Sequence, residues 1–232
     1  RRHNPELGLS VSAMVLRGVH YTELGGSRFS FQAFIPVGKV GTAQVGGGTL
    51  GTSDGIGDLT LGATWYPLAS DSPTGTTLGL TAFLIAPTGA YKFGNANLGS
   101  GTWTFAPQIG LMQGLGNGFF FDGALDVALQ KDHTESGVEV SRDPSVQVQT
   151  YLRYRQGPTT AFSIGYSGMF GGDLDVNGSC SGQKTRVDQI QAFAQHFTSQ
   201  STQRQLMLAK DIHVEGGFKS DYVAQIRFLK VF

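Results

Sequence analysis

The sequence predicts an all-β protein, a transmembrane antiparallel β-barrel, and three observations predict it. Apolar and polar side chains alternate with period two through runs of about ten to fourteen residues, whereas helical periodicity is almost absent. These runs exceed the usual five or six residues of a globular strand and suit the roughly nine to eleven that a tilted strand needs to cross a bilayer. The segments between them are alternately short and long, as are the periplasmic turns and extracellular loops of outer-membrane barrels.

Eleven strands are expected, and each corresponds to one alternating run. From the N-terminus they are residues 7–20, 27–37, 57–67, 75–86, 101–113, 119–132, 144–156, 160–171, 185–198, 203–214 and 222–232. Strand 75–86 is apolar on both faces, and Pro107 predicts a bulge in strand 101–113 because proline removes a ladder hydrogen bond. The last strand ends on the aromatic Phe232, as outer-membrane proteins typically do.

An odd number of strands conflicts with the even numbers of single-chain bacterial barrels. We therefore expect one more strand before Arg1, which gives twelve; ten is the alternative if the strand assignment is wrong. Residues 1–232 then form a single outer-membrane barrel domain that lacks its first strand.

The two faces of the strands differ in chemistry. In a membrane barrel the apolar face meets lipid and the polar face lines the lumen, whereas a soluble sandwich has the opposite arrangement. Expected lipid-facing residues include Phe31, Leu61, Leu80, Phe121, Leu152 and Phe228. The expected pore-lining residues are Asp122, Asp126, Gln147, Gln149, Tyr151, Arg153, Arg155, Gln191, Phe193, Gln225 and Arg227. Asp122 is expected roughly opposite Arg153 and Arg155, either as a brace between strands or as a charged constriction.

Composition excludes several classes of protein. Lys plus Arg and Asp plus Glu are both 17, so the net charge is zero and the basic footprint of a nucleic-acid-binding protein is missing. No run approaches the 18 apolar residues of a transmembrane helix. The one cysteine, Cys180, rules out a disulfide scaffold within this chain, and its role stays open.

Several short motifs follow one another in a recognisable order. Residues 55–62 read GIGDLTLG, residues 87–91 read PTGAY, and Asn95, Asn97 and Gly99 precede WTFAP at 103–107. Gly165-Tyr166 and Gly171-Gly172-Asp173 follow later. This order, over residues 55–232, resembles the bacterial outer-membrane family of the MetA pathway of phenol degradation, whereas the N-terminal part matches poorly. The resemblance implies a channel barrel of bacteria that degrade aromatic or apolar compounds, and no enzyme.

The sequence has partial motifs for two further chemistries, and neither is favoured. Asp173, Asp175 and Asn177 match half of a calcium loop, but its twelfth position is Lys184 where a glutamate is needed. We expect a polar loop there, with no metal and no cofactor elsewhere. His133, Glu135 and Ser136 share one loop but point apart, so no catalytic triad and no enzyme is expected.

The function expected is an outer-membrane diffusion channel for small apolar or weakly polar molecules, aromatic compounds among them. The alternative is a closed barrel that serves as structural anchor, adhesin or lipid-binding protein without transport. The expected partners are the bilayer, lipopolysaccharide and the small permeant, with no nucleic acid. The protein is expected to be a monomer in the bacterial outer membrane.

Overall fold

A computed structural model describes residues 8–45, 48–181, 185–216 and 219–231, which form one large antiparallel sheet and one small one. The path of the large sheet is β1 (Gly8–Leu24), β2 (Ser27–Val45), β5 (Leu59–Leu68), β6 (Thr76–Ala86), β7 (Thr104–Gly116), β8 (Phe119–Gln130), β11 (Ser145–Gln156), β12 (Thr160–Gly171), β15 (Thr185–Ser199), β16 (Thr202–Glu215) and β17 (Val223–Lys230). Each expected strand is present, although β1 and β2 extend further than predicted. Among the described residues, no helix is long and apolar enough to cross a membrane.

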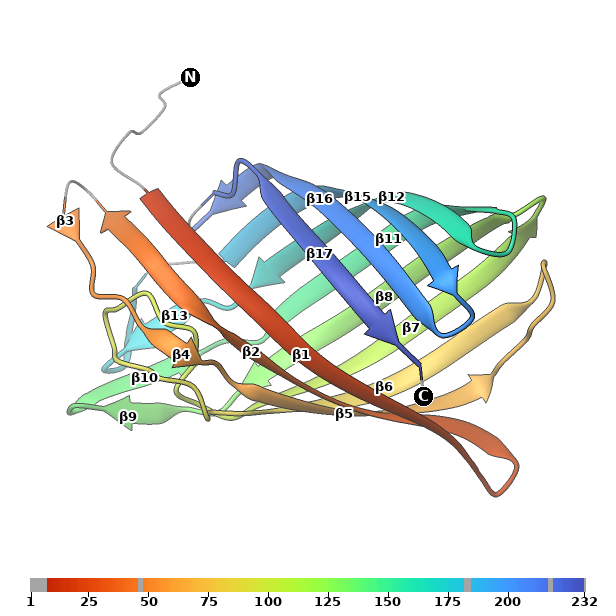
Figure 1. The fold of residues 1–232 in the computed structure, drawn as a ribbon. Coiled ribbons are helices and arrows are strands. Elements are labelled where there is room, and N and C mark those ends of the chain that lie inside the picture. The colour runs from red at the N-terminus through yellow and green to blue at the C-terminus, as the bar shows by residue number, and fades with distance from the viewer. Residues whose placement is uncertain (1–7, 46–47, 182–184, 217–218, 232) are drawn as a thin grey trace.

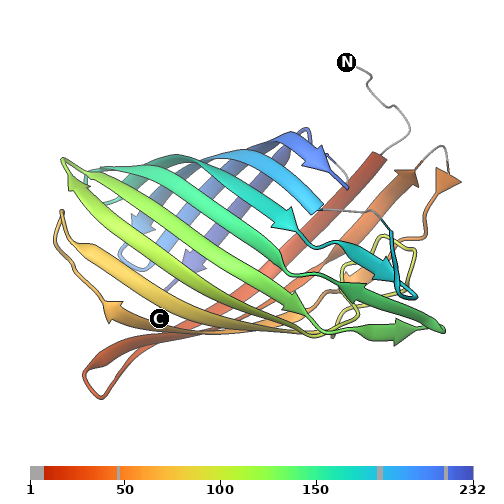
Figure 2. The ribbon, with the colours of Figure 1, turned by 180° about the vertical axis from the view of Figure 1, so that it is seen from behind.

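The large sheet curls until its two edge strands face each other, as Figures 1 and 2 show. Neighbours along the path pair in antiparallel fashion from β1 to β17, but β1 and β17 share no pairing in the described residues. Because eleven strands alternate in direction, β1 and β17 run the same way. The twelve-strand count stays a prediction.

The two ends of the curled sheet are built differently. At the short-turn end, tight turns join the strands; Gly25-Gly26 and Asn117-Gly118 take the positive φ angles of type I′ hairpins. At the long-loop end lie residues 48–58, 87–103, 131–144 and 172–181, gathered on the left of Figure 1. The predicted alternation of short and long connections therefore separates the two ends in space.

The long loops contain strands that the sequence analysis missed. β3 (Gly48–Thr49) and β4 (Asp54–Ile56) pair with the extended end of β2. The small sheet has the order β14-β13-β10-β9, formed by β9 (His133–Glu135), β10 (Val138–Arg142), β13 (Leu174–Val176) and β14 (Ser179–Cys180). Its hairpins turn at Ser136-Gly137 and Asn177-Gly178, again with positive φ. Loops 133–143 and 172–181 are thus joined into one structure.

The prediction of a bulge at Pro107 is wrong. Phe105 pairs with Leu129 and Gln108 with Asp126, so the register between β7 and β8 is the same on both sides of the proline. The ladder with β8 lacks pairs at 106–107, and on the other side Pro107 pairs with Ala82 of β6 without a register shift. The register shifts instead between Gly114 and Gly116, where Gly116 has a φ of 82°.

Large apolar side chains lie on the outside of the curled sheet. No described side chain of large volume is fully buried, so an ordinary apolar core is missing from this part of the chain. The outward residues that the sequence predicted are all exposed, from 37% to 71%: Phe31, Leu61, Leu80, Phe121, Leu152 and Phe228. An apolar surface of this extent requires an apolar surrounding medium.

Candidate functional site

Contacts between strands that are not neighbours identify the concave face of the sheet. Arg153 on β11 places Nη2 2.9 Å from the sulfur of Met112 on β7, across β8. The hydroxyl of Tyr151 on β11 donates to Oε1 of Gln191 on β15 at 2.8 Å, across β12. Strands two apart are separated by roughly 10 Å, so such side chains meet only where the sheet curves toward them. The polar face is therefore the concave face.

Asp122 and Arg153 form a bidentate ion pair on this face, near the short-turn end. Arg153 donates from Nε to Oδ2 at 2.8 Å and from Nη2 to Oδ1 at 3.0 Å. The guanidinium groups of Arg153 and Arg155 both lie over the ring of Phe120, at 4.7 and 4.9 Å from its centroid. Among the described residues no acid pairs with Arg155. One arginine is therefore neutralised and the other keeps its charge beside a cavity of about 460 Å³ at this end.

A ladder of polar side chains crosses β11, β15 and β16. Beyond the Tyr151–Gln191 contact, Gln191 donates to Gln189, and Gln189 donates to Oδ1 of Asp211 at 2.7 Å. The ring of Phe193 packs edge-on against Tyr151 with centroids 5.5 Å apart. The concave face therefore mixes amide and aromatic groups, as the sequence predicts.

The other residues expected to line the pore lie in register on the same face. Asp126 accepts a hydrogen bond from Gln108 at 3.2 Å, and Gln147 donates to Ser167 at 3.4 Å. Gln149, Gln225 and Arg227 stand opposite Ser167, Met207 and Gln205. That these side chains line a conducting pore stays a prediction.

The calcium-loop candidate belongs to the small sheet. Asn177 is in the β13–β14 turn, and its Oδ1 accepts a hydrogen bond from the backbone N–H of Glu139 at 2.9 Å. Asp175 pairs with Ser141 on one side and with Cys180 on the other. Lys184 lies outside the described residues, as does Phe232. Within the described residues no three His, Cys, Asp or Glu side chains are close enough to hold a metal ion.

Asp58, to which the sequence analysis gave no role, fastens the loop 87–103 to the start of β5. Asp58 is 8% exposed, and its carboxylate accepts hydrogen bonds from the backbone of Gly89 at 2.9 Å and of Ser100 at 2.6 Å. The Ser100 hydroxyl donates to the same carboxylate at 2.6 Å. Neutral donors thus hold a buried carboxylate, which requires such hydrogen bonds to be stable away from water.

Three glycines make this attachment close. A Cβ on Gly89 would lie 2.8 Å from the backbone of Gly57 and 2.9 Å from that of Gly99. Only glycine permits such an approach of three backbone segments. We call Asp58, Gly57, Gly89, Gly99 and Ser100 the loop clasp. The sequence contained a signal for the loop clasp: Gly57-Asp58 at the start of a strand, followed by PTG at 87–89 and Gly99-Ser100.

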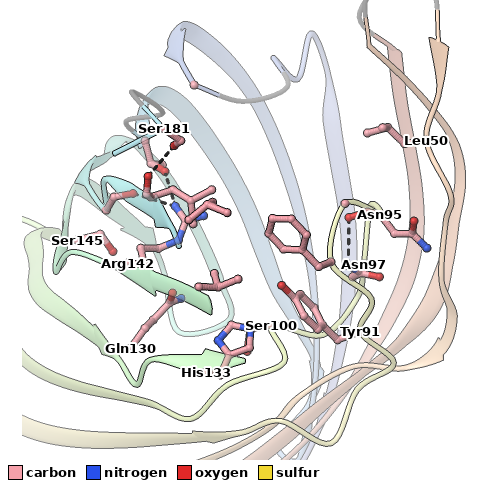
Figure 3. A pocket seen from close by; sticks show the side chains of 18 of the residues that line it. Leu50, Tyr91, Asn95, Asn97, Ser100, Gln130, His133, Arg142, Ser145 and Ser181 are labelled. Atoms are coloured by element: carbon pink, nitrogen blue, oxygen red, sulfur yellow. Dashed lines mark hydrogen bonds between the residues drawn. The ribbon is translucent and has the colours of Figure 1, made fainter. Parts of the chain in front are cut away.

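A pocket of about 890 Å³ opens at the long-loop end, between the loop 87–103 and the small sheet (Figure 3). Tyr91 and Phe93 come from the loop, whereas His133 and Arg142 come from β9 and β10. Gln130 at the end of β8 also lines it, and this residue belongs to the concave face. The pocket is therefore the mouth of the space that the concave face surrounds.

Tyr91 is an aromatic residue in the lining of this mouth. It lies against Gly101, where a Cβ would approach the ring within 2.3 Å, and packs edge-on against His133 with centroids 5.5 Å apart. Burial raises the pKa of the Tyr91 phenol, Glu135 raises it further, and Arg142 opposes them. The phenol is therefore a neutral hydroxyl at physiological pH.

Comparison with known proteins gives results that agree with this geometry. The family model described as "Putative MetA-pathway of phenol degradation" matches residues 3–228. The COG4313 outer membrane channel from Pseudomonas putida F1 is similar in structure, with a TM-score of 0.89 and 28% sequence identity over 97% of this chain and 85% of that chain. No curated protein matches. The N-terminal part, which was expected to match poorly, is thus covered by the family as well.

The curled antiparallel sheet, the apolar exterior and the structural match define an outer-membrane β-barrel protein of the channel class. The chain belongs to the family of the MetA pathway of phenol degradation.

Proposed function

We propose that this protein is a passive outer-membrane channel for small apolar or weakly polar molecules, aromatic compounds among them. It acts as a monomer surrounded by lipid and lipopolysaccharide, and it needs no catalysis and no cofactor. The observation that carries the proposal is the mixed chemistry of the concave face. Edge-on ring pairs lie on this face, Phe34 with Phe83 on β2 and β6 and Tyr151 with Phe193 on β11 and β15, and the second pair adjoins the ladder of Gln191 and Gln189.

This mixture suits solutes that lipopolysaccharide excludes. An apolar molecule gains contact with the rings, while the amides keep the path wetted so that binding stays weak enough for release. A channel that carried sugars or phosphate would instead need rings of charge. Here Asp122 neutralises Arg153, and Asp126 is bound by Gln108.

The test combines conductance with uptake. The purified protein is placed in planar bilayers and single-channel currents are recorded. Uptake of labelled toluene and benzyl alcohol is then measured in a porin-deficient bacterial host, with an eight-stranded barrel whose interior is filled by side chains as control. We expect discrete currents and faster uptake than in the control cells. Absence of both would favour the alternative, a closed barrel that acts as an anchor, adhesin or lipid-binding protein.

A further inference from the structure

We propose that the pocket at the long-loop end binds a small aromatic molecule that carries one carboxylate, with Arg142 as the partner of the anion. The inference rests on the proposed function and extends its permeants from apolar and weakly polar aromatic molecules to aromatic molecules with one negative charge. It depends on three features of the pocket: an uncompensated cation, a rigid aromatic wall, and a polar atom left without a partner.

Arg142 supplies a positive charge that no described acid neutralises. Its Nη1 donates to the carbonyl oxygen of Gly172 at 2.9 Å and to the hydroxyl of Thr185 at 3.4 Å, both of which are neutral. None of the ion pairs among the described residues includes it. Among the described lining residues it is the one with a permanent charge. Its planar guanidinium retains further N–H groups that match a carboxylate.

The opposite wall is aromatic and fixed. Tyr91 and Phe93 project from the loop 87–103 toward the small sheet, as Figure 3 shows for Tyr91. The loop clasp holds this loop in place through Asp58, so the wall is formed before a ligand arrives. Leu174 and Met169 add apolar surface. The volume of about 890 Å³ falls within the range of pockets for small molecules.

His133 provides the third feature. Its Nε2 is buried without a hydrogen-bond partner among the described residues. A buried polar atom of this kind is costly unless it is bonded. Because Nε2 is closed to solvent, a ligand oxygen bound by Arg142 satisfies it after the His133 ring turns toward the pocket. Glu135, on the same strand as His133, is an acid whose charge raises the pKa of Tyr91. It does not line the pocket, so it does not occupy the place of the ligand's carboxylate. Its negative charge nevertheless weakens the binding of an anion there.

The experiment measures binding to the purified, detergent-solubilised protein by calorimetry. The probes are benzoate, its neutral isostere benzamide, and acetate, which has the charge without the ring. The variants are Arg142→Gln, Arg142→Lys, Glu135→Gln and the control Lys131→Gln, which removes a cation of the same end that does not line the pocket. Trypsin resistance shows whether each variant keeps its fold.

We expect benzoate to bind about tenfold or more tightly than benzamide and acetate, since a charge-assisted hydrogen bond and a ring site each contribute about that factor. Arg142→Gln should remove the preference for benzoate over benzamide, whereas Arg142→Lys should retain part of it. Glu135→Gln should strengthen benzoate binding, and Lys131→Gln should leave the preference intact.

Equal binding of benzoate and benzamide to the wild-type protein would overturn the inference, as would a benzoate preference that survives in a folded Arg142→Gln variant. Because binding is measured without a membrane, this result is independent of transport. A protein that binds benzoate but gives no current would disprove the channel and keep the site. A protein that conducts but binds no probe would disprove the carboxylate site and keep the channel.

Discussion

Leu152 and Gln149 belong to the same strand, three residues apart, and meet opposite environments. Leu152 points outward with 46% exposure, while Gln149 stands opposite Ser167 on the concave face. A charged side chain on the lipid side must leave water, whereas one on the inner side stays hydrated. The odd and even positions of β11 therefore differ in what they tolerate.

Leu152→Arg should lower the free energy of unfolding by roughly 2–4 kcal/mol if it lies near the bilayer midplane. Gln149→Arg, the matched control on the inner face, should lower it by much less. Denaturant unfolding of both variants in phospholipid vesicles measures the difference. Equal losses at the two positions would show that the assignment of faces is wrong.

Asp58 is a single side chain on which a whole loop depends. Asp58→Asn keeps one oxygen acceptor and replaces the other with an NH2 donor. Either the N–H of Gly89 or the two donors of Ser100 then lose their partner, a loss of about 1–3 kcal/mol in local stability. Trypsin should then cleave after the exposed Lys92 of the loop 87–103 faster than in the wild type. The exposed Asp54 of β4 supplies the control, Asp54→Asn, for which cleavage should be unchanged. A folded Asp58→Asn protein with wild-type cleavage would contradict the role of the clasp.

At the scale of the element, the strands were predictable and the loops were not. The alternation in 144–156 or 160–171 locates a strand because successive side chains face lipid and lumen in turn, and each environment requires a different polarity. Loop residues do not alternate between two environments, so period-two patterns did not predict β9, β10, β13 and β14. Asn177-Gly178 alone was a hairpin signal. The candidate site divides in the same way: the polar face followed from period two, while the clasp and the pocket depend on contacts between loops far apart in the sequence.

Asp122, Arg153 and Arg155 lie on adjacent strands, and their charges have two candidate roles: to brace the sheet or to set the ion selectivity of the channel. Neutralising Arg153 and Arg155 together should change single-channel conductance or shift the reversal potential in a salt gradient toward cation preference, because Arg155 carries an unpaired charge on the concave face. Arg204→Gln, which removes a charge from the outward face of β16, is the control that should leave both unchanged. If the double variant conducts as the wild type does, these arginines only brace the sheet.

For the whole molecule, the open question is how β1 and β17 are joined. Unpaired backbone groups in the bilayer core cost several kcal/mol each, so both edges require a partner. A twelfth strand that runs antiparallel to both edges fits, because β1 and β17 run in the same direction.

A closed barrel predicts slow exchange at both edges. In hydrogen exchange on the protein purified from outer membranes, the amides of β1 and β17 should be as protected as those of β11 in the centre of the sheet. The same sample should migrate faster in detergent gels before boiling than after. Rapid exchange confined to β1 and β17 would disprove the closure.

The loop clasp has a consequence for how the chain enters the membrane. Its donors and its acceptor come from two different connections, at residues 57–58 and at 89–100, and both lie at the long-loop end. Bacterial barrels place their long loops outside. We expect the same orientation here, in which these segments meet after they have crossed the bilayer. The carboxylate of Asp58 then binds backbone groups that would otherwise need water. Once formed, the loop clasp opposes the return of β5 and β6 through the bilayer, because the hydrogen bonds of Asp58 would have to break first.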